Sequence, residues 1–411
     1  MTEQTQRQAI ISRVKNLVLK HHFNIEKIDY AEWCREVDEQ SAILSAADDG
    51  IFEEGIRALL AKLKSSHTNF YTADVNSTKP QHVIGATLRS VSDSGRSHWM
   101  FLDVFEDGPA ARAGAAPGQL LVSVDGAPAI PPVFPAFRFG QDHYITTKLP
   151  RQPETSALVI TVPQKKTRKG RPPLIEPKSV RHCMLTQRIG LLKVPFFLGS
   201  FGIRFSNLLN AAVEDLKAKG CDRLIIDLRG CLGGSLGFAT LVSYLCADQI
   251  PIGYDVTRKR LQRGYAACEL PRVPMPRTKA GVLFCLARFS VQDKSLMLLT
   301  QGMGPQPFHG HIVILVNEFT SSAGEMAAQF AKDTKLATLV GQKTMGNVLG
   351  STTFSVGNGY ILYIPIIGWY GPKGNHTEGS GVEPDVLVDI DPEALARGSD
   401  AQLNTAFDVL Q

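Results

Sequence analysis

Residues 312–325, IVILVNEFTSSAGE, run from an apolar segment directly into a helical one. Five consecutive branched apolar residues predict a strand that is buried on both faces. The serine that opens the helix, Ser322, lies where free backbone N–H groups and the helix dipole can stabilise a developing oxyanion. The spacing Ser322-x-x-Glu325 also fits a plain capping box, which on spacing alone is the favoured interpretation.

The sequence around this stretch alternates between strand-like and helix-like patterns. This alternation predicts a sheet covered by helices. We expect strands at residues 189–194, 223–227, 312–316, 336–341 and 360–365, and helices at 202–219, 235–247 and 322–332. Residues 250–308 show no clear periodicity, and we interpret them as an insertion that lines or covers a cleft.

The first 165 residues have a different character. Apolar residues recur at helical spacing through residues 5–65, where glycine and proline are nearly absent. From residue 82 the chain predicts short strands, at 83–88 and 99–105, then a short helix near 109–114. Asp125-Gly126 predicts a tight hairpin turn after another strand.

The composition describes an ordinary globular protein, with 411 residues, 44% hydrophobic and 20% charged residues, and a net charge of +5. This length predicts two or three domains. The basic run at 165–171 is typical of a solvated linker rather than a nucleic-acid site. Seven scattered cysteines without metal-ligand spacing indicate free thiols in a reducing compartment. Without a signal-like or membrane-spanning apolar run, we expect a cytoplasmic protein.

A second glycine-rich segment follows a predicted strand, at residues 224–234, LIIDLRGCLGG. Glycines at this point allow positive φ angles and a close approach of the backbone to a substrate carbonyl. A phosphate loop or a simple left-handed turn is also compatible with the segment. Its spacing differs from that of a Walker loop or a GxGxxG fingerprint, which disfavours nucleotide binding.

Taken in order, four motifs resemble those of the tail-specific (carboxy-terminal processing) serine peptidases. They are residues 227–234, DLRGCLGG; 316–325, VNEFTSSAGE; 341–346, GQKTMG; and 378–385, EGSGVEPD. Residues 108–118 resemble the PDZ domains that these enzymes carry. The resemblance covers about residues 60–390.

This resemblance implies an α/β multidomain fold with a ClpP/crotonase-like serine peptidase core. The expected parts are a helical N-terminal region (1–80), a PDZ-like β-rich domain (82–165), a basic linker (166–178), the peptidase core (179–395, with the insertion at 250–308) and a C-terminal tail (396–411).

The resemblance also assigns roles to residues of the core. Ser322 would be the nucleophile, and the backbone N–H groups of Gly233 and Ala323 would form the oxyanion hole. The bacterial branch has a lysine base after the glycine that Gly346 matches, but here that position is Asn347. An amide cannot take the serine's proton, and Lys343 lies in the wrong register to replace the lysine.

A branch exemplified by the tricorn protease uses histidine instead, and this chain has matching residues. His67 would be the general base, with Glu378 orienting it, either directly or through Ser66. A neutral imidazole with a pKa of roughly 6.5 can act as base and then acid at neutral pH. A helix-end histidine without a catalytic task is the plain alternative for His67, and His376 is a rival base.

We expect a serine endopeptidase that acts through an acyl-enzyme on unfolded or C-terminally exposed polypeptides. Backbone N–H groups around Ile84, Gly85 and Ala86 are candidates for holding a peptide's C-terminal carboxylate, unless that groove is blocked. The alternative is a non-catalytic protein that binds peptides or apolar ligands, as the retinoid-binding protein of the eye does on this core. No metal, cofactor, nucleic acid or membrane is expected, and the sequence does not set an oligomeric state.

Overall fold

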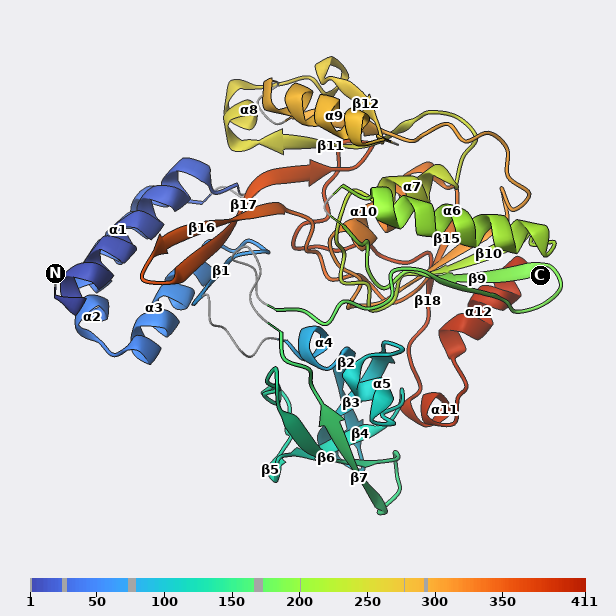
Figure 1. Cartoon of the computed structure of the whole chain (residues 1–411), viewed down its shortest axis with the longest axis horizontal. Coiled ribbons are helices and arrows are strands. Elements are labelled where there is room, and N and C mark those ends of the chain that lie inside the picture. Colours follow the sequence, from blue (N-terminus) through green and yellow to red (C-terminus); the bar gives the residue numbers. More distant parts are fainter. Residues whose placement is uncertain are drawn as a thin grey trace.

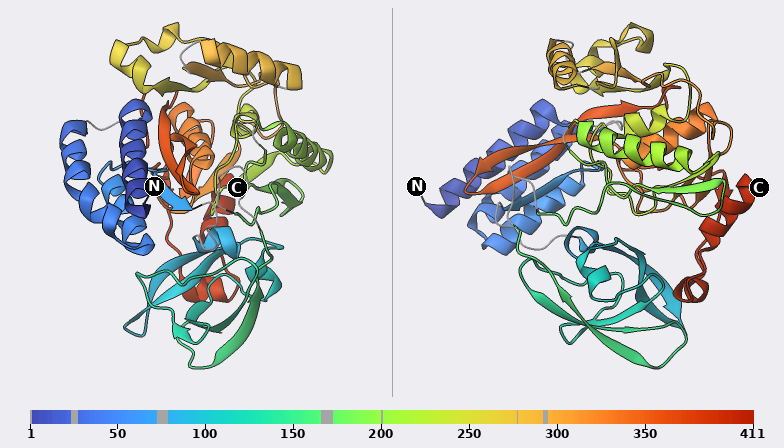
Figure 2. Two further views of the ribbon diagram at one scale, coloured as in Figure 1. Left: turned by 60° about the vertical axis from the view of Figure 1, so that its left-hand side comes forward. Right: turned by 45° about the vertical axis from the view of Figure 1, so that its right-hand side comes forward.

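Three six-stranded sheets organise the computed structural model, which describes residues 2–23, 28–72, 79–165, 173–199, 201–276, 278–291 and 295–411. Helices α1 to α3 flank one sheet at the N-terminal side, and another sheet, with strands between residues 86 and 161, lies below the central one (Figure 1). Both views in Figure 2 place that lower sheet at the opposite end of the molecule from helices α8 and α9.

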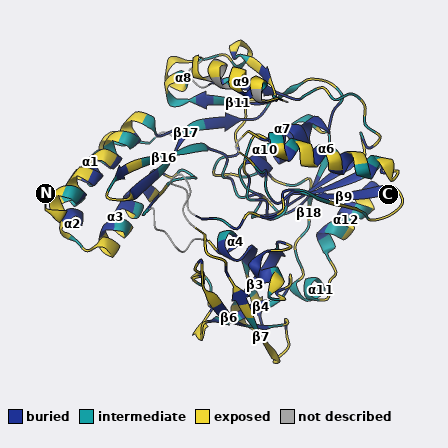
Figure 3. Cartoon of the chain, in the orientation of Figure 1, coloured by how far each residue is buried: buried dark blue, intermediate teal, exposed yellow. Residues whose placement is uncertain are grey.

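The central sheet has the strand order β18-β15-β14-β10-β9-β8 and is parallel except for its edge strand β8. Its strands are β8 (Arg181–Met184), β9 (Ile189–Lys193), β10 (Arg223–Asp227), β14 (Ile312–Val316), β15 (Thr338–Gly341) and β18 (Val386–Leu387). Helices α6 (Ile203–Ala218), α7 (Phe238–Ser243) and α10 (Ala323–Thr334) pack on one face. All five residues of β14 are buried because the other face is covered too. In Figure 3 the strands of the central sheet around β9 and β18 are mostly dark blue.

The C-terminal residues supply that second cover, so the predicted tail at 396–411 is wrong. After α11 (Pro392–Ala396), helix α12 (Ala401–Leu410) buries Ala406 and Leu410 against the central sheet. Arg229 of the glycine-rich motif fixes this helix, because its guanidinium donates to Asp400 at 2.9 Å and to Gln402 at 3.1 Å. The same guanidinium pairs with Asp227. Arg229, paired with Asp227, therefore anchors the start of α12 to the glycine-rich motif.

A second sheet, of order β1-β17-β11-β13-β12 with β16 beside β17, joins segments from both halves of the chain. Its strands are β1 (Asn69–Thr72), β11 (Pro251–Thr257), β12 (Arg272–Pro274), β13 (Leu296–Leu299), β16 (Gly350–Gly357) and β17 (Tyr360–Tyr370). Helices α1 (Glu3–His21), α2 (Tyr30–Ala46) and α3 (Asp49–Ala61) bury their apolar faces against β1, β16 and β17.

Residues 250–308 are more regular than the sequence suggested. Strands β11 and β13 extend the second sheet, and the segment also contains α8 (Arg258–Arg263), the 3-10 turn Ala267–Glu269 and α9 (Lys279–Val291). Apolar residues show no clear periodicity in this part of the sequence because its helices and strands are short and only partly buried. The segment interpreted as an insertion is therefore in part an extension of the second sheet.

The third sheet contains the strands between residues 86 and 161, in the order β2-β3-β4-β6-β7 with β5 beside β4. The elements are α4 (Pro80–Val83), β2 (Ala86–Asp93), β3 (Arg96–Val104), α5 (Pro109–Arg112), β4 (Leu120–Val124), β5 (Ala127–Pro128), β6 (Asp142–Lys148) and β7 (Thr155–Thr161). The expected strand at 83–88 begins only at Ala86, because Pro80 starts a helical turn that ends at Val83. We call residues 80–161 the β2–β7 module.

Two sequence expectations concern turns and linkers. The predicted turn at Asp125-Gly126 is confirmed, since both residues have positive φ (49° and 80°) and Val124 pairs with Ala127 across it. Most of the basic linker, residues 166–172, lies outside the described residues. None of the seven cysteines, all of which lie in the described residues, forms a disulfide. Among the described helices, none has the length and apolarity to cross a bilayer.

Candidate active site

Ser322 lies at the junction of β14 and α10 in an unusual backbone conformation. Its φ of 53° and ψ of −118° are rare for a residue with a side chain. Hydrogen bonds hold the junction in place: the Ser321 N–H donates to Cys231 O and the Ser322 N–H to Asn347 O, each at 3.0 Å. A strained, partly exposed serine at a strand-to-helix junction is typical of a nucleophile.

Glu325 binds this junction to a neighbouring loop. Its buried carboxylate accepts the Ser322 N–H at 3.2 Å, which is the carboxylate half of a capping box. It also accepts the N–H groups of Gly346 at 2.6 Å and Asn347 at 2.7 Å, and the Thr344 hydroxyl at 2.6 Å. Burial raises the pKa of Glu325, and these four donors oppose that rise. Glu325 therefore does more than cap a helix.

The glycine-rich loop passes directly beside the serine. A Cβ on Gly233 would lie 2.6 Å from Ser322 Cβ and 3.2 Å from Ser322 Oγ, so only glycine fits here. Gly233 and Gly234 both have positive φ, and Phe197 hydrogen-bonds to Gly233 O at 2.9 Å. Ala323, the first residue of α10, has no intrahelical acceptor for its N–H. Gly233 and Ala323 thus flank the serine on two sides.

Cys231 comes two residues before Gly233 in the sequence, and its thiol is buried. Burial raises its pKa to about 12, although the Gly233 N–H opposes the rise. The thiol therefore stays neutral at physiological pH and is no rival nucleophile.

Glu378, Ser66 and His67 form a hydrogen-bonded chain that joins distant parts of the sequence. Glu378 accepts the Ser66 N–H at 2.7 Å and the Ser66 hydroxyl at 2.9 Å, and Ser66 Oγ lies 2.9 Å from His67 Nδ1. Because the single hydroxyl proton goes to the carboxylate, His67 Nδ1 must be the donor to Ser66 Oγ. The other ring nitrogen, Nε2, then carries the free lone pair.

Residues 346–348 connect this chain to the serine. Asn347 O accepts the Ser322 N–H, and the next residue, Val348, donates its N–H to Glu378 at 3.0 Å. Gly379, which follows Glu378, donates to Gly346 O at 2.8 Å. One short loop therefore bridges the serine junction and the carboxylate that holds Ser66 and His67.

His67 is half-buried and held in a fixed conformation. Its backbone has a positive φ of 54°, and its ring lies 6.1 Å from that of Tyr363 in β17. Burial, with a smaller contribution from Lys79, lowers its pKa to about 4. The imidazole is therefore neutral at physiological pH, which is the form that a general base needs.

The rival residues lie elsewhere or have other partners. His376 is exposed, with its ring 5.9 Å from that of Tyr370. Lys343 is exposed and pairs with Glu383 at 2.8 Å, as expected from its register. Within the described part of the chain, Asn347 forms hydrogen bonds through its backbone only.

The predicted carboxylate site at Ile84, Gly85 and Ala86 is only partly available. All three residues are buried, and the Ile84 N–H already donates to Pro80 O at 2.8 Å, so it cannot also bind a ligand. Gly85 has a positive φ of 70° and β2 is an edge strand of its sheet. The N–H groups of Gly85 and Ala86 remain the candidates.

Sequence reasoning missed two residues that hold these segments together. Asn317 connects the glycine-rich loop to the serine junction, since its side-chain oxygen accepts the N–H groups of Gly230 at 2.9 Å and Phe319 at 3.1 Å. Asp103, from β3, accepts from the other end of that amide at 3.1 Å. An asparagine directly after the apolar run 312–316 was a usable sequence signal for Asn317. Nothing in the sequence indicated Asp103.

Comparison with known proteins places this geometry in a family. Residues 188–388 match the model of peptidase family S41. A probable CtpA-like serine protease of Staphylococcus haemolyticus is 23% identical over 389 residues, which cover 92% of this chain and 68% of the relative. A carboxyl-terminal-processing protease of Picosynechococcus is 26% identical over 227 residues, covering 54% of this chain and 45% of that protein.

Solved structures share the fold. Mature CPAF complexed with lactacystin aligns with a TM-score of 0.58 at 13% identity, over 100% of this chain and 98% of that one. The tricorn protease aligns with a TM-score of 0.50 at 17% identity, over 100% of this chain and 37% of that one. The non-catalytic alternative has no support in these matches. Through residues 188–388 the chain belongs to peptidase family S41, and it is a serine-type peptidase.

Proposed function

We propose that Ser322 is the nucleophile of an endopeptidase whose general base is His67, oriented by Glu378 through Ser66. The observation that carries this proposal is the hydrogen-bonded chain from Glu378 through Ser66 to His67 Nδ1, which leaves the Nε2 lone pair free. The loop at 346–348 couples this chain to Ser322. The proposal places the chain nearer to the tricorn-type branch than to the branch with a lysine base.

The proposed reaction proceeds in two halves. His67 Nε2 takes the Ser322 hydroxyl proton as Oγ attacks the scissile carbonyl carbon, and the oxyanion forms beside the N–H groups of Gly233 and Ala323. The imidazolium then gives its proton to the leaving amine, the C–N bond breaks, and an acyl-enzyme remains on Ser322. Water, deprotonated by the same imidazole, hydrolyses the ester and restores the serine.

We propose unfolded or C-terminally exposed polypeptides as the substrate class. The β2–β7 module offers an edge strand next to Gly85 and Ala86, where a peptide can add a strand and place its carboxylate. The carboxyl-terminal-processing relative supports the same class.

Turnover of peptides that differ only at the C-terminus tests this proposal. The wild-type protein should cleave an unfolded peptide with a free carboxylate faster than its C-terminal amide, and Ser322→Ala should cleave neither. Cleavage of both peptides at equal rates would contradict the substrate class but leave the serine mechanism intact. Equal cleavage by Ser322→Ala and the wild type would refute the mechanism.

A further inference from the structure

The β2–β7 module contacts the serine junction at two consecutive residues, Asn317 and Glu318. Asp103 Oδ2, at the end of β3, accepts from Asn317 Nδ2 at 3.1 Å. Arg89, in β2, lies 3.3 Å from Glu318 Oε1. Both contacts fall on the five-residue segment between β14 and Ser322, so this module lies directly against the segment that positions the nucleophile.

Asn317 is the residue through which such a contact can matter. Its Oδ1 accepts two backbone donors, one from Gly230 in the glycine-rich loop and one from Phe319 in the serine junction. This one side-chain oxygen therefore links the two loops that carry Gly233 and Ser322, in addition to the backbone hydrogen bond from Ser321 N–H to Cys231 O. If this amide rotated by half a turn, its NH₂ group would face two N–H donors and both hydrogen bonds would be lost.

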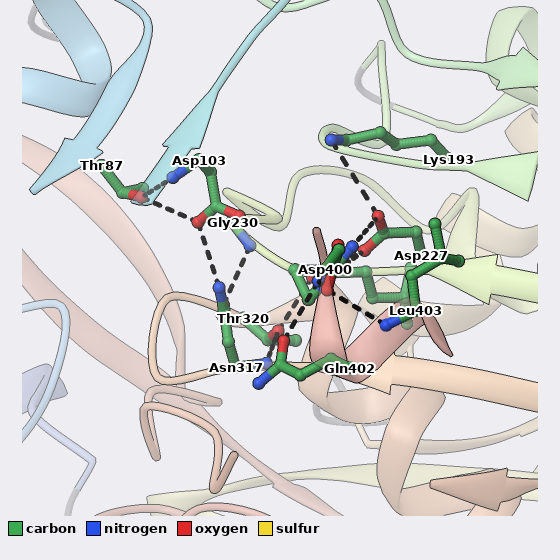
Figure 4. A network of polar contacts seen from close by, with 12 residues as sticks. Thr87, Asp103, Lys193, Asp227, Gly230, Asn317, Thr320, Asp400, Gln402 and Leu403 are labelled. Carbon is green, nitrogen blue, oxygen red and sulfur yellow. Dashed lines mark hydrogen bonds and ion pairs between the residues drawn. The ribbon is translucent and has the colours of Figure 1, made fainter. Parts of the chain in front are cut away.

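Asp103 determines which way the amide points. Asp103 Oδ2 accepts hydrogen bonds from Thr87 Oγ1 and Asn317 Nδ2, so it selects the Nδ2 end of Asn317 and leaves Oδ1 for the two loops. Asp103 is itself fixed, because Thr87 Oγ1 donates to it at 2.7 Å and receives its N–H at 2.9 Å (Figure 4). It is 8% exposed, and a Cβ on Gly230 would lie 2.9 Å from its Cγ. The contact between the module and the loop is therefore close and specific.

We propose that Asp103 is a positioning residue for the oxyanion hole, supplied by the β2–β7 module and acting through the orientation of the Asn317 amide. This inference rests on the proposed function of Ser322, Gly233 and Ala323. It makes the module part of the catalytic apparatus for every substrate, including those too small to reach a peptide groove.

A matched pair of variants tests the proposal: Asp103→Ala and, as control, Asp93→Ala. Asp93 is another buried carboxylate of the same module, 6% exposed, but it pairs within the module with Lys148 at 2.6 Å and the Arg151 N–H at 2.9 Å. The substrate is a small activated ester, and rates are expressed per serine titrated with a fluorophosphonate. This normalisation removes any difference in folded fraction.

We expect Asp103→Ala to lower kcat by roughly tenfold or more with little change in KM, because small displacements of catalytic groups are costly. Asp93→Ala should keep kcat within about twofold, and Asp103→Asn, whose amide oxygen can still accept from Asn317, should recover most of the loss. If Asp103→Ala does not fold, Thr87→Val must lower kcat instead, since it removes the hydroxyl that fixes Asp103.

An unchanged kcat in Asp103→Ala, or equal losses in Asp103→Ala and Asp93→Ala, would overturn the proposal while the active wild type upheld the proposed function. For a non-folding Asp103→Ala, an unchanged kcat in Thr87→Val would do the same. A folded wild type that neither labels nor hydrolyses the ester would overturn the proposed function and this inference together.

Discussion

The two halves of the proposed catalytic site are built in different ways. The Ser322 junction lies within residues 188–388, between a fully buried strand and a helix, and Glu325 accepts four hydrogen bonds beneath it. His67 lies outside that region, in the segment between α3 and the edge strand β1, and depends on Ser66 and Glu378. The core therefore fixes Ser322, the proposed nucleophile, whereas packing between distant segments places His67, the proposed base.

Removing the nucleophile should have the largest effect. Ser322→Ala should lower kcat/KM by a factor on the order of 10⁴ or more, because no other group can form the acyl-enzyme. Peptide cleavage followed by mass spectrometry measures this loss. Ser321→Ala, which changes the adjacent residue, is the control and should retain most activity; equal losses in both variants would show that the junction, and not the hydroxyl, had been disturbed.

Removing the proposed base should have the second-largest effect on activity. His67→Ala should lower kcat by a factor on the order of 10³, because the Ser322 proton then has no acceptor. His376→Ala should leave turnover within about twofold, since that ring is exposed and packs against Tyr370. Loss of turnover in His376→Ala alone would transfer the role of base to His376.

Altering the hydrogen-bonded chain from Glu378 through Ser66 to His67 should have an intermediate effect on turnover. In Glu378→Gln the amide can donate to Ser66 Oγ, so the Ser66 hydroxyl would be free to donate to His67 Nδ1 and favour the wrong tautomer. We expect kcat to fall roughly 100-fold, whereas Glu383→Gln, a surface carboxylate paired with Lys343, should change little. If Glu378→Gln kept the wild-type kcat on the same peptide, His67 would not need Glu378 and Ser66 to orient it.

The pH dependence should give the smallest effect. The folded pKa of His67 is lowered to about 4, mainly by burial, so the neutral base is present above that pH. We therefore expect kcat/KM to stay nearly flat from pH 8 to about 5.5 and to fall as pH decreases through about 4. An inflection near 6.5, the unperturbed value, would indicate a solvated base.

The same shift has a consequence for stability. The unfolded chain binds a proton at His67 below about pH 6.5, while the folded protein binds it only below about 4. His22, whose pKa is also lowered to about 4, mainly by burial, behaves in the same way. The free energy of unfolding should thus decrease as pH falls from about 6.5 to about 4, which urea unfolding at several pH values would measure.

How much the sequence predicted depends on whether a feature leaves a local signal. Strand β14, helix α10 and the glycine-rich loop were predictable, because a run of buried apolar residues and positive-φ glycines leave local signals. The helix α12 was missed, since its ten residues show their apolar face only once a sheet is placed beneath them. Asp103 was missed because its role depends on a contact with Asn317, 214 positions away.

The most direct test of the account is the rate at which a fluorophosphonate modifies the folded protein, followed by intact mass and peptide mapping. We predict a single adduct on Ser322 in the wild type, and formation of that adduct roughly 100-fold or more slower in His67→Ala. A folded wild type without the adduct, or His67→Ala labelled as fast as the wild type, would contradict the pairing of Ser322 with His67.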